Sequence, residues 1–106
     1  MIERPIYIDI DGTLTLEPKR PWGSPIEARI ETVQRLIANG KPVVIWSGGG
    51  TTYAGLFAYR YGLSGAVCIG KPEKIVDNCP TIRPVRRMPI LTPEQFFGRP
   101  RREMEA

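Results

Sequence analysis

Histidine is absent from this 106-residue chain, and only two cysteines are present. Without histidine, His-based zinc centres, histidine general bases and Ser-His-Asp triads are excluded. Two cysteines are too few for the disulfide framework of a small secreted domain, and Cys68, in an apolar run, is expected to be a buried free thiol. No apolar stretch has the length of a signal peptide or a membrane span. We therefore expect a cytoplasmic protein with no membrane partner.

Length and composition are those of one small globular domain. Of the 106 residues, 42% are hydrophobic and 25% are charged, which suits a single modest core. The formal net charge of +4 is unevenly distributed, because residues 80–106 contain six arginines and only three glutamates. The sequence therefore predicts a domain over residues 1–91 and a short helix with a basic tail over residues 92–106.

Apolar segments and helix signals alternate along the chain. Ser24, Pro25 and Glu27 resemble a capping box that starts one helix, and Thr51 or Thr52 suits the start of a second. A β-α-β-α-β order predicts an α/β fold in which a parallel sheet carries helices on both faces, a three-layer sandwich. Strands are expected over residues 5–10, 43–47, 66–69, 75–77 and 88–91, and helices over residues 24–39, 51–61 and from Thr92.

Polar residues follow the expected strands. Asp9 and Asp11 follow the first, Ser47 ends the second, Lys71 follows the third and Asp77 ends the fourth. Because ligands of α/β sheets bind beyond the carboxyl ends of the strands, these side chains are expected to converge at one edge.

The stretch Asp9-Ile10-Asp11-Gly12-Thr13 is the most specific pattern, expected about once in 10⁵ starting positions at average residue usage. Two solvated carboxylates in a tight turn are the alternative. Carboxylates this close repel each other unless a hard cation neutralises them, and Mg²⁺ favours carboxylate oxygens together with substrate phosphate. The pattern therefore predicts a magnesium-dependent phosphate site.

Over about residues 5–80 the chain resembles the small, capless phosphatases of the haloacid dehalogenase (HAD) superfamily. The resemblance comes from the Asp-x-Asp-Gly-Thr motif after a hydrophobic strand, then from Ser47 with Gly48, Lys71 and Asp77 in that order. It implies a HAD/Rossmann-like core without a cap domain. It also implies a hydrolase that releases phosphate from a phosphate monoester through an aspartyl-phosphate intermediate.

The resemblance also implies roles for single residues. Asp9 would be the nucleophile, and Asp11 would protonate the leaving oxygen and then activate water. Ser47 and the Gly48 N–H would donate hydrogen bonds to the phosphoryl oxygens, and Lys71 would neutralise their charge. Taken alone, Ser47 also suits a helix cap and Lys71 an ordinary loop.

The expected metal ligands are Asp9, the backbone carbonyl of Asp11, and Asp77 with Asn78. Relatives often have a second acid where this chain has Asn78, and an amide brings less negative charge to Mg²⁺. Taken alone, Asp77 and Asn78 also suit a turn.

Only a loop fits between Asp11 and Ser24, so the site is expected to be open. Trp22 would flank the entrance with Lys19 and Arg20, or would anchor the loop on the core. The expected partner is a phosphorylated substrate, and an open site also admits a phosphorylated macromolecule such as a nucleic-acid end.

A second hypothesis is a catalytically weak or inactive HAD-fold module that binds nucleic acid or a partner protein through its Arg-rich tail. The pair Asp9 and Asp11 argues against it, and six arginines without interleaved aromatic residues give nucleic-acid recognition weak support.

Overall fold

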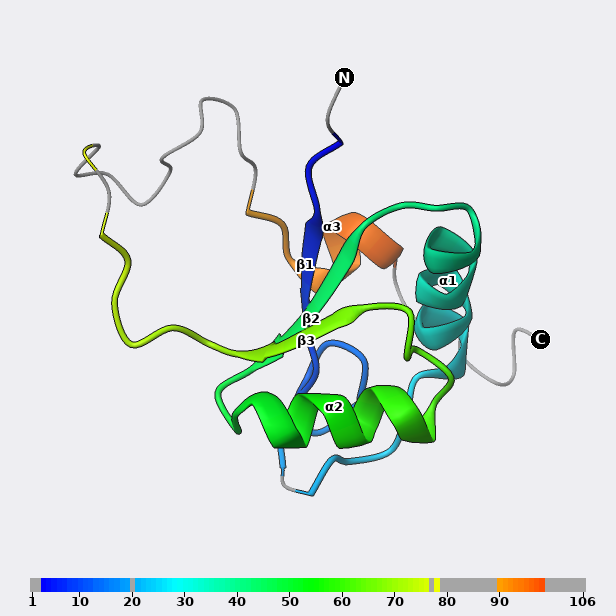
Figure 1. The fold of residues 1–106 in the computed structure, drawn as a ribbon. Coiled ribbons are helices and arrows are strands. Elements are labelled where there is room, and N and C mark those ends of the chain that lie inside the picture. Colours follow the sequence, from blue (N-terminus) through cyan, green and yellow to red (C-terminus); the bar gives the residue numbers. More distant parts are fainter. Residues whose placement is uncertain (1–2, 20, 77, 79–89, 99–106) are drawn as a thin grey trace. The chain divides into compact units, whose positions relative to one another are not determined.

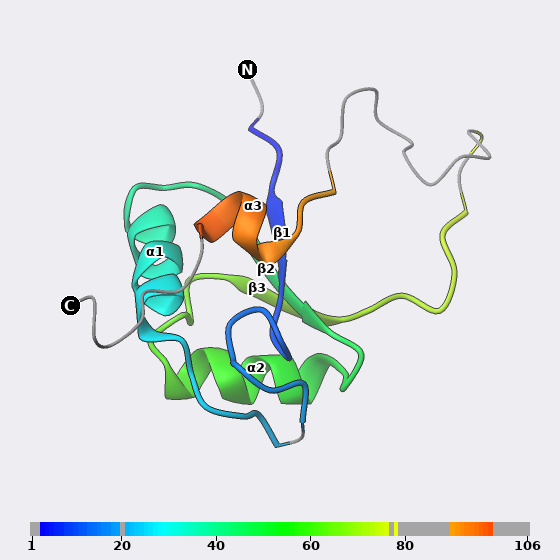
Figure 2. The same ribbon diagram turned by 180° about the vertical axis from the view of Figure 1, so that it is seen from behind.

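Three short strands form a parallel sheet in the order β1-β2-β3 (Figures 1 and 2). This computed structural model describes residues 3–19, 21–76, 78 and 90–98. The chain divides into two units, Met1–Lys71 and Pro72–Ala106, and each is described by itself. The predicted α/β class and the parallel sheet are confirmed. The strands are β1 (Ile6–Asp9), β2 (Val43–Ser47) and β3 (Val67–Gly70), and the helices are α1 (Glu27–Ala38), α2 (Thr51–Arg60) and α3 (Pro93–Phe97).

Helix α1 connects β1 to β2, and α2 connects β2 to β3. Both connections step in the same direction, so right-handed crossovers put both helices on one face of the sheet. The predicted three-layer sandwich, with helices on both faces, is therefore not confirmed by the described residues of the first unit. At the edges of the sheet the burial agrees: Ile8 is buried on the helix side, whereas Tyr7 and Val67 on the other face are 49% and 60% exposed, and only Val44 of the central strand is buried there. Among the described residues, no helix is long and apolar enough to cross a membrane.

The core of the first unit is aliphatic with one large aromatic ring. Helix α1 buries Ile30 and Val33 of its predicted apolar stripe, and α2 buries Phe57. Burying each such side chain stabilises the fold by about 1.5–3 kcal/mol relative to exposure. Cys68 is a free thiol as predicted, but it is only half-buried, and this partial burial raises its pKa.

The predicted start of α1 is wrong. The helix begins at Glu27 after Ile26, and no side chain caps it. Ser24 instead donates its N–H and its hydroxyl to the carboxylate of Glu17, at 2.7 and 3.2 Å, and Pro25 forms an isolated antiparallel bridge outside the helix. Ser24 and Pro25 therefore pair with residues of the loop that precedes α1 and do not form the first turn of the helix.

In the second unit, α3 begins where the sequence predicts. The Thr92 hydroxyl accepts from the N–H of Gln95, whose side chain accepts from the Thr92 N–H, which completes a capping box. The predicted fourth strand is wrong at Ile75 and Val76, which form no strand and are 68% and 96% exposed. The predicted edge strand is also wrong at Ile90 and Leu91, which form no strand and are 62% and 49% exposed. The remaining residues of the two predicted strands, 77, 88 and 89, lie outside the described residues.

Thr15 offers a test of the loop after β1. Its side chain is fully buried, and its Oγ1 accepts the Gly12 N–H at 3.2 Å and donates to the Glu17 carbonyl at 3.0 Å. Thr15→Val keeps the shape but leaves these groups without the hydroxyl, so the free energy of unfolding should fall by about 1–3 kcal/mol in urea denaturation. Thr32→Val, on the exposed side of α1, should change it by less than about 0.5 kcal/mol. Equal effects would contradict this account of the loop.

Candidate active site

Asp9 and Asp11 lie on either side of a buried residue at the end of β1. The side chain of Ile10 is fully buried, and its carbonyl accepts the N–H groups of Thr13 and Leu14 at 3.0 and 2.8 Å. The chain therefore turns back at once after the strand. Gly12 lies within this turn with φ +80°, a conformation that glycine adopts without steric cost. The turn brings both carboxylates to the carboxyl end of the sheet.

Two contacts hold the loop that follows. Arg29 of α1 is buried, and its Nη1 donates to the Thr13 carbonyl at 2.8 Å. The carboxylate of Glu17 accepts the Ser24 N–H, which lowers the pKa of Glu17. This role of Arg29 was not predicted from the sequence. The sequence pattern that could have indicated this role is a charged residue three positions after Ile26, next to the apolar stripe of the predicted helix.

Trp22 anchors this loop on the core. Its ring meets the rings of Tyr53, Phe57 and Tyr61 edge-on, with centroid distances of 5.8, 5.4 and 6.2 Å. Edge-to-face pairs of this kind add to the energy of burial. Of the two alternatives, the anchor is therefore the one that the structure supports.

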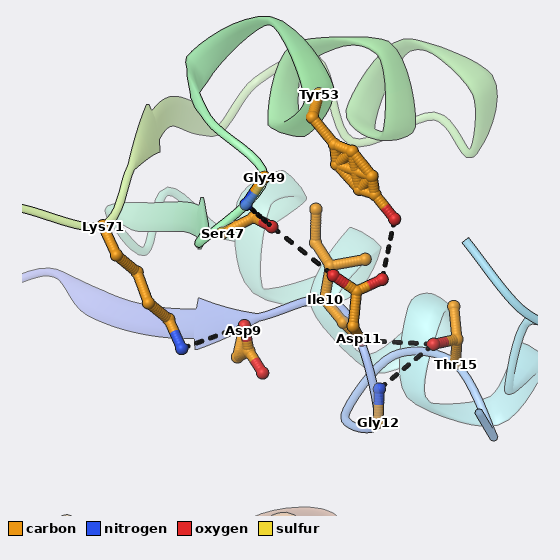
Figure 3. Close-up of polar contacts among 9 residues, drawn as sticks. All are labelled: Asp9, Ile10, Asp11, Gly12, Thr15, Ser47, Gly49, Tyr53 and Lys71. Carbon is orange, nitrogen blue, oxygen red and sulfur yellow. Dashed lines mark hydrogen bonds and ion pairs between the residues drawn. The ribbon is translucent and has the colours of Figure 1, made fainter. Parts of the chain in front are cut away.

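The ends of β2 and β3 bring a lysine to Asp9. The Lys71 N–H donates to the Ser47 carbonyl at 2.9 Å, so the parallel pairing extends past Gly70. The Gly70 N–H donates to Thr51 Oγ1 at 2.9 Å, which fixes the end of β3 to the start of α2. From this position Lys71 Nζ lies 3.3 Å from Asp9 Oδ1 (Figure 3). The ion pair links two strand ends that are 62 positions apart in the numbering.

Two hydroxyl groups donate to Asp11. Tyr53 donates to Asp11 Oδ1 at 2.7 Å, and Ser47 donates to Oδ2 at 3.5 Å (Figure 3). The Ser47 Oγ accepts the Gly49 N–H at 3.0 Å. Tyr53 was missed from the sequence, where its only signal is its place in the first turn of the helix after Ser47.

A pocket of about 510 Å³ opens at this edge of the sheet. It is lined by Asp9, Asp11, Pro18, Gly48 and Lys71. Four predicted site residues therefore share one pocket. Ser47 is also at this edge but is fully buried and does not line the pocket.

The last two predicted site residues, Asp77 and Asn78, do not belong to the first unit. Asn78 is exposed and belongs to the second unit, and Asp77 lies outside the described residues. Their predicted part in metal binding stays a prediction.

Two of the predicted metal ligands suit a hard cation. Asp9 and Asp11 both line one pocket, where a carboxylate oxygen of Asp9 and the backbone carbonyl of Asp11 are oxygen donors, and Mg²⁺ is commonly bound by one or two carboxylates together with waters and substrate phosphate. In the part of the chain that the structure describes, no group of three His, Cys, Asp or Glu side chains is placed to hold a metal. The oxygen donors that are present fit Mg²⁺ and do not form a complete protein cage.

Comparison with protein-family models, with curated proteins and with solved structures finds no match. The chemistry of the pocket is therefore inferred from its own residues.

Glycine substitutions test the close packing that positions Lys71. A Cβ on Gly70 would lie 3.1 Å from Gly50 Cα and 3.3 Å from the Thr51 nitrogen, both backbone atoms. Gly70→Ala should therefore lower the free energy of unfolding by about 1–3 kcal/mol in urea denaturation. Gly55→Ala, inside α2 with no atom within 4 Å of its Cβ, should raise it by about 0.5–1 kcal/mol. Loss of stability in both variants, or in neither, would contradict the packing.

Proposed function

We propose that this protein is a Mg²⁺-dependent phosphohydrolase of the HAD type, which cleaves a phosphate monoester through an aspartyl-phosphate on Asp9. One observation carries the proposal: Asp9, Asp11 and Lys71 line the same open pocket, with Lys71 Nζ 3.3 Å from Asp9. Two features support a capless HAD/Rossmann-like core. The sheet is parallel, and only a loop follows Asp11 at the point where capped relatives insert a cap domain.

In the first step, a carboxylate oxygen of Asp9 attacks the phosphorus atom. A bond forms between that oxygen and phosphorus as the bond to the leaving oxygen breaks, and the leaving oxygen keeps the electron pair. Asp11, protonated at this stage, gives its proton to that oxygen. A carboxylate nucleophile is suitable because the acyl phosphate that it forms is readily hydrolysed.

In the second step, Asp11 acts as a base. It takes a proton from a water molecule whose oxygen attacks the same phosphorus atom, and the bond between phosphorus and Asp9 breaks. Asp9 is regenerated as a carboxylate and inorganic phosphate leaves. Asp11 is protonated again and ready for the next substrate.

The phosphoryl oxygens need positive groups that are already in place. Lys71 supplies a charge, and the Gly48 N–H is a backbone donor on a residue that lines the pocket. Ser47 would reach a phosphoryl oxygen only by turning its hydroxyl away from Asp11. In the arrangement described here it supports Asp11.

Mg²⁺ bound at this pocket would neutralise the clustered carboxylates and draw charge from the phosphoryl oxygens. Asp9 and the Asp11 carbonyl would hold it, with Asp77 and Asn78 as the further ligands that the HAD resemblance implies.

The open pocket supports a substrate whose phosphate projects from a larger molecule, including a phosphorylated macromolecule. The competing hypothesis is a binding module that uses the Arg-rich tail. All six of those arginines lie outside the described residues, so the structure does not test this hypothesis.

Asp9→Asn tests the nucleophile. The amide is equal in size but a poor nucleophile, so Mg²⁺-dependent phosphate release should fall by about 10⁴-fold or more while the fold is kept. Release should be measured on p-nitrophenyl phosphate, sugar phosphates, nucleotides and oligonucleotides phosphorylated at either end, with Mg²⁺ and with EDTA.

The matched control is Glu31→Gln, the same carboxylate-to-amide change on α1, which should leave the rate within about twofold. Turnover by Asp9→Asn within tenfold of the parent would remove the mechanism. A parent that releases no phosphate but binds oligonucleotides with a steep salt dependence would favour the binding module.

Magnesium should also stabilise the fold. An ion that binds only the folded chain adds about 2.7 kcal/mol at one hundred times its Kd, so Tm should rise across millimolar Mg²⁺. Asp77→Ala should remove most of this rise, whereas Asn78→Asp should enlarge it by adding negative charge. A Tm that does not respond to Mg²⁺, in a protein that stays active in EDTA, would contradict the metal site.

A further inference from the structure

Tyr53 reaches Asp11 from α2, a helix that supplies none of the predicted site residues. It is the third residue of α2, and its hydroxyl donates to Asp11 Oδ1 at 2.7 Å (Figure 3). This length is that of a well-formed hydrogen bond from a hydroxyl to an oxygen acceptor. It is shorter than the 3.5 Å contact from Ser47 to the other oxygen of Asp11.

Packing fixes the ring of Tyr53 on two sides. A Cβ on Gly49 would lie 2.9 Å from the ring, so the absent side chain of Gly49 gives the ring its space. The Trp22 ring meets it edge-on at a centroid distance of 5.8 Å. This packing fixes the position of the Tyr53 hydroxyl. The hydrogen bond from that hydroxyl in turn restricts the orientation of the Asp11 carboxyl group.

The two carboxyl groups of the pocket are contacted from different elements. Lys71 Nζ lies 3.3 Å from Asp9, and the hydroxyls of Tyr53 and Ser47 donate to Asp11. The hydrogen bond from Tyr53 orients the Asp11 carboxyl group, because a short hydrogen bond fixes the direction of the acceptor oxygen.

From this geometry we propose that Tyr53 is a positioning residue for Asp11. The inference rests on the proposed phosphohydrolase function. The Tyr53 hydroxyl donates to Oδ1 at 2.7 Å, and the proton that passes to the leaving oxygen is carried on Oδ2, where the contact from Ser47 is longer, at 3.5 Å. In that step the O–H bond of Asp11 breaks and a bond forms between the proton and the leaving oxygen, while the O–H bond of Tyr53 stays intact.

Tyr53→Phe removes the hydroxyl and keeps the ring. The test compares kcat/KM for two substrates, since this ratio reports the steps through formation of the aspartyl-phosphate. An alkyl phosphate needs a proton on its leaving oxygen, whereas nitrophenolate leaves p-nitrophenyl phosphate without one. We expect kcat/KM to fall about tenfold for the alkyl phosphate and less than about threefold for p-nitrophenyl phosphate.

The matched control is Tyr61→Phe, which removes a hydroxyl from a second ring packed against Trp22. It should leave both ratios unchanged. An equal loss for the two substrates in Tyr53→Phe would indicate a merely structural tyrosine and would overturn the inference.

A second measurement does not depend on turnover. In EDTA, Tyr53→Phe should lower the Tm of the parent but have little further effect in an Asp11→Ala background, because the two changes remove the same contact. Additive shifts would overturn the inference even in an active enzyme. A parent without any phosphatase activity would instead overturn the proposed function, and the catalytic part of Tyr53 with it, whatever the melting data show.

Discussion

The contacts that hold Asp9 and Asp11 at the end of β1 are the interactions on which the rest of the site depends. A single buried residue separates the two acids, and each is contacted by a side chain from another element. Lys71 reaches Asp9 from beyond β3, and Tyr53 reaches Asp11 from α2. Partners from two different elements explain why the site needs the whole first unit and not only the motif that carries the acids.

The closeness of these elements depends on small residues and on main-chain pairing. The hydrogen bond from the Lys71 N–H to the Ser47 carbonyl extends the β2-β3 ladder by one step, and this step sets where the lysine leaves the sheet. The ladder can run so near the start of α2 because Gly70 lies against Gly50 with no Cβ between them. Backbone geometry therefore sets the distance between the ammonium group and Asp9.

The fold class and most of the pocket could be predicted from the sequence, and the reason is geometric. Carboxyl ends of parallel strands meet at one edge, so residues that follow separate strands, such as Asp9 and Lys71, converge without any knowledge of side-chain packing. Tyr53 and Arg29 could not be found in this way, because they make hydrogen bonds across 42 and 16 positions. The predicted helix cap at Ser24 was wrong because Ser24 hydrogen-bonds to Glu17 in the preceding loop and does not cap α1.

The openness of the pocket bears on the choice between hydrolysis and transfer. The side chains of Asp9 and Lys71 are 31% and 44% exposed, and Trp22, which could have flanked the entrance, packs on the core instead. A site that transfers a phosphoryl group to another acceptor must exclude water from its reactive intermediate. In the proposed mechanism, water could reach an aspartyl-phosphate on the partly exposed Asp9, and Asp11 would take the proton from it. For the proposed phosphohydrolase, the partial exposure of Asp9 and Lys71 therefore suits water as the acceptor of the phosphoryl group.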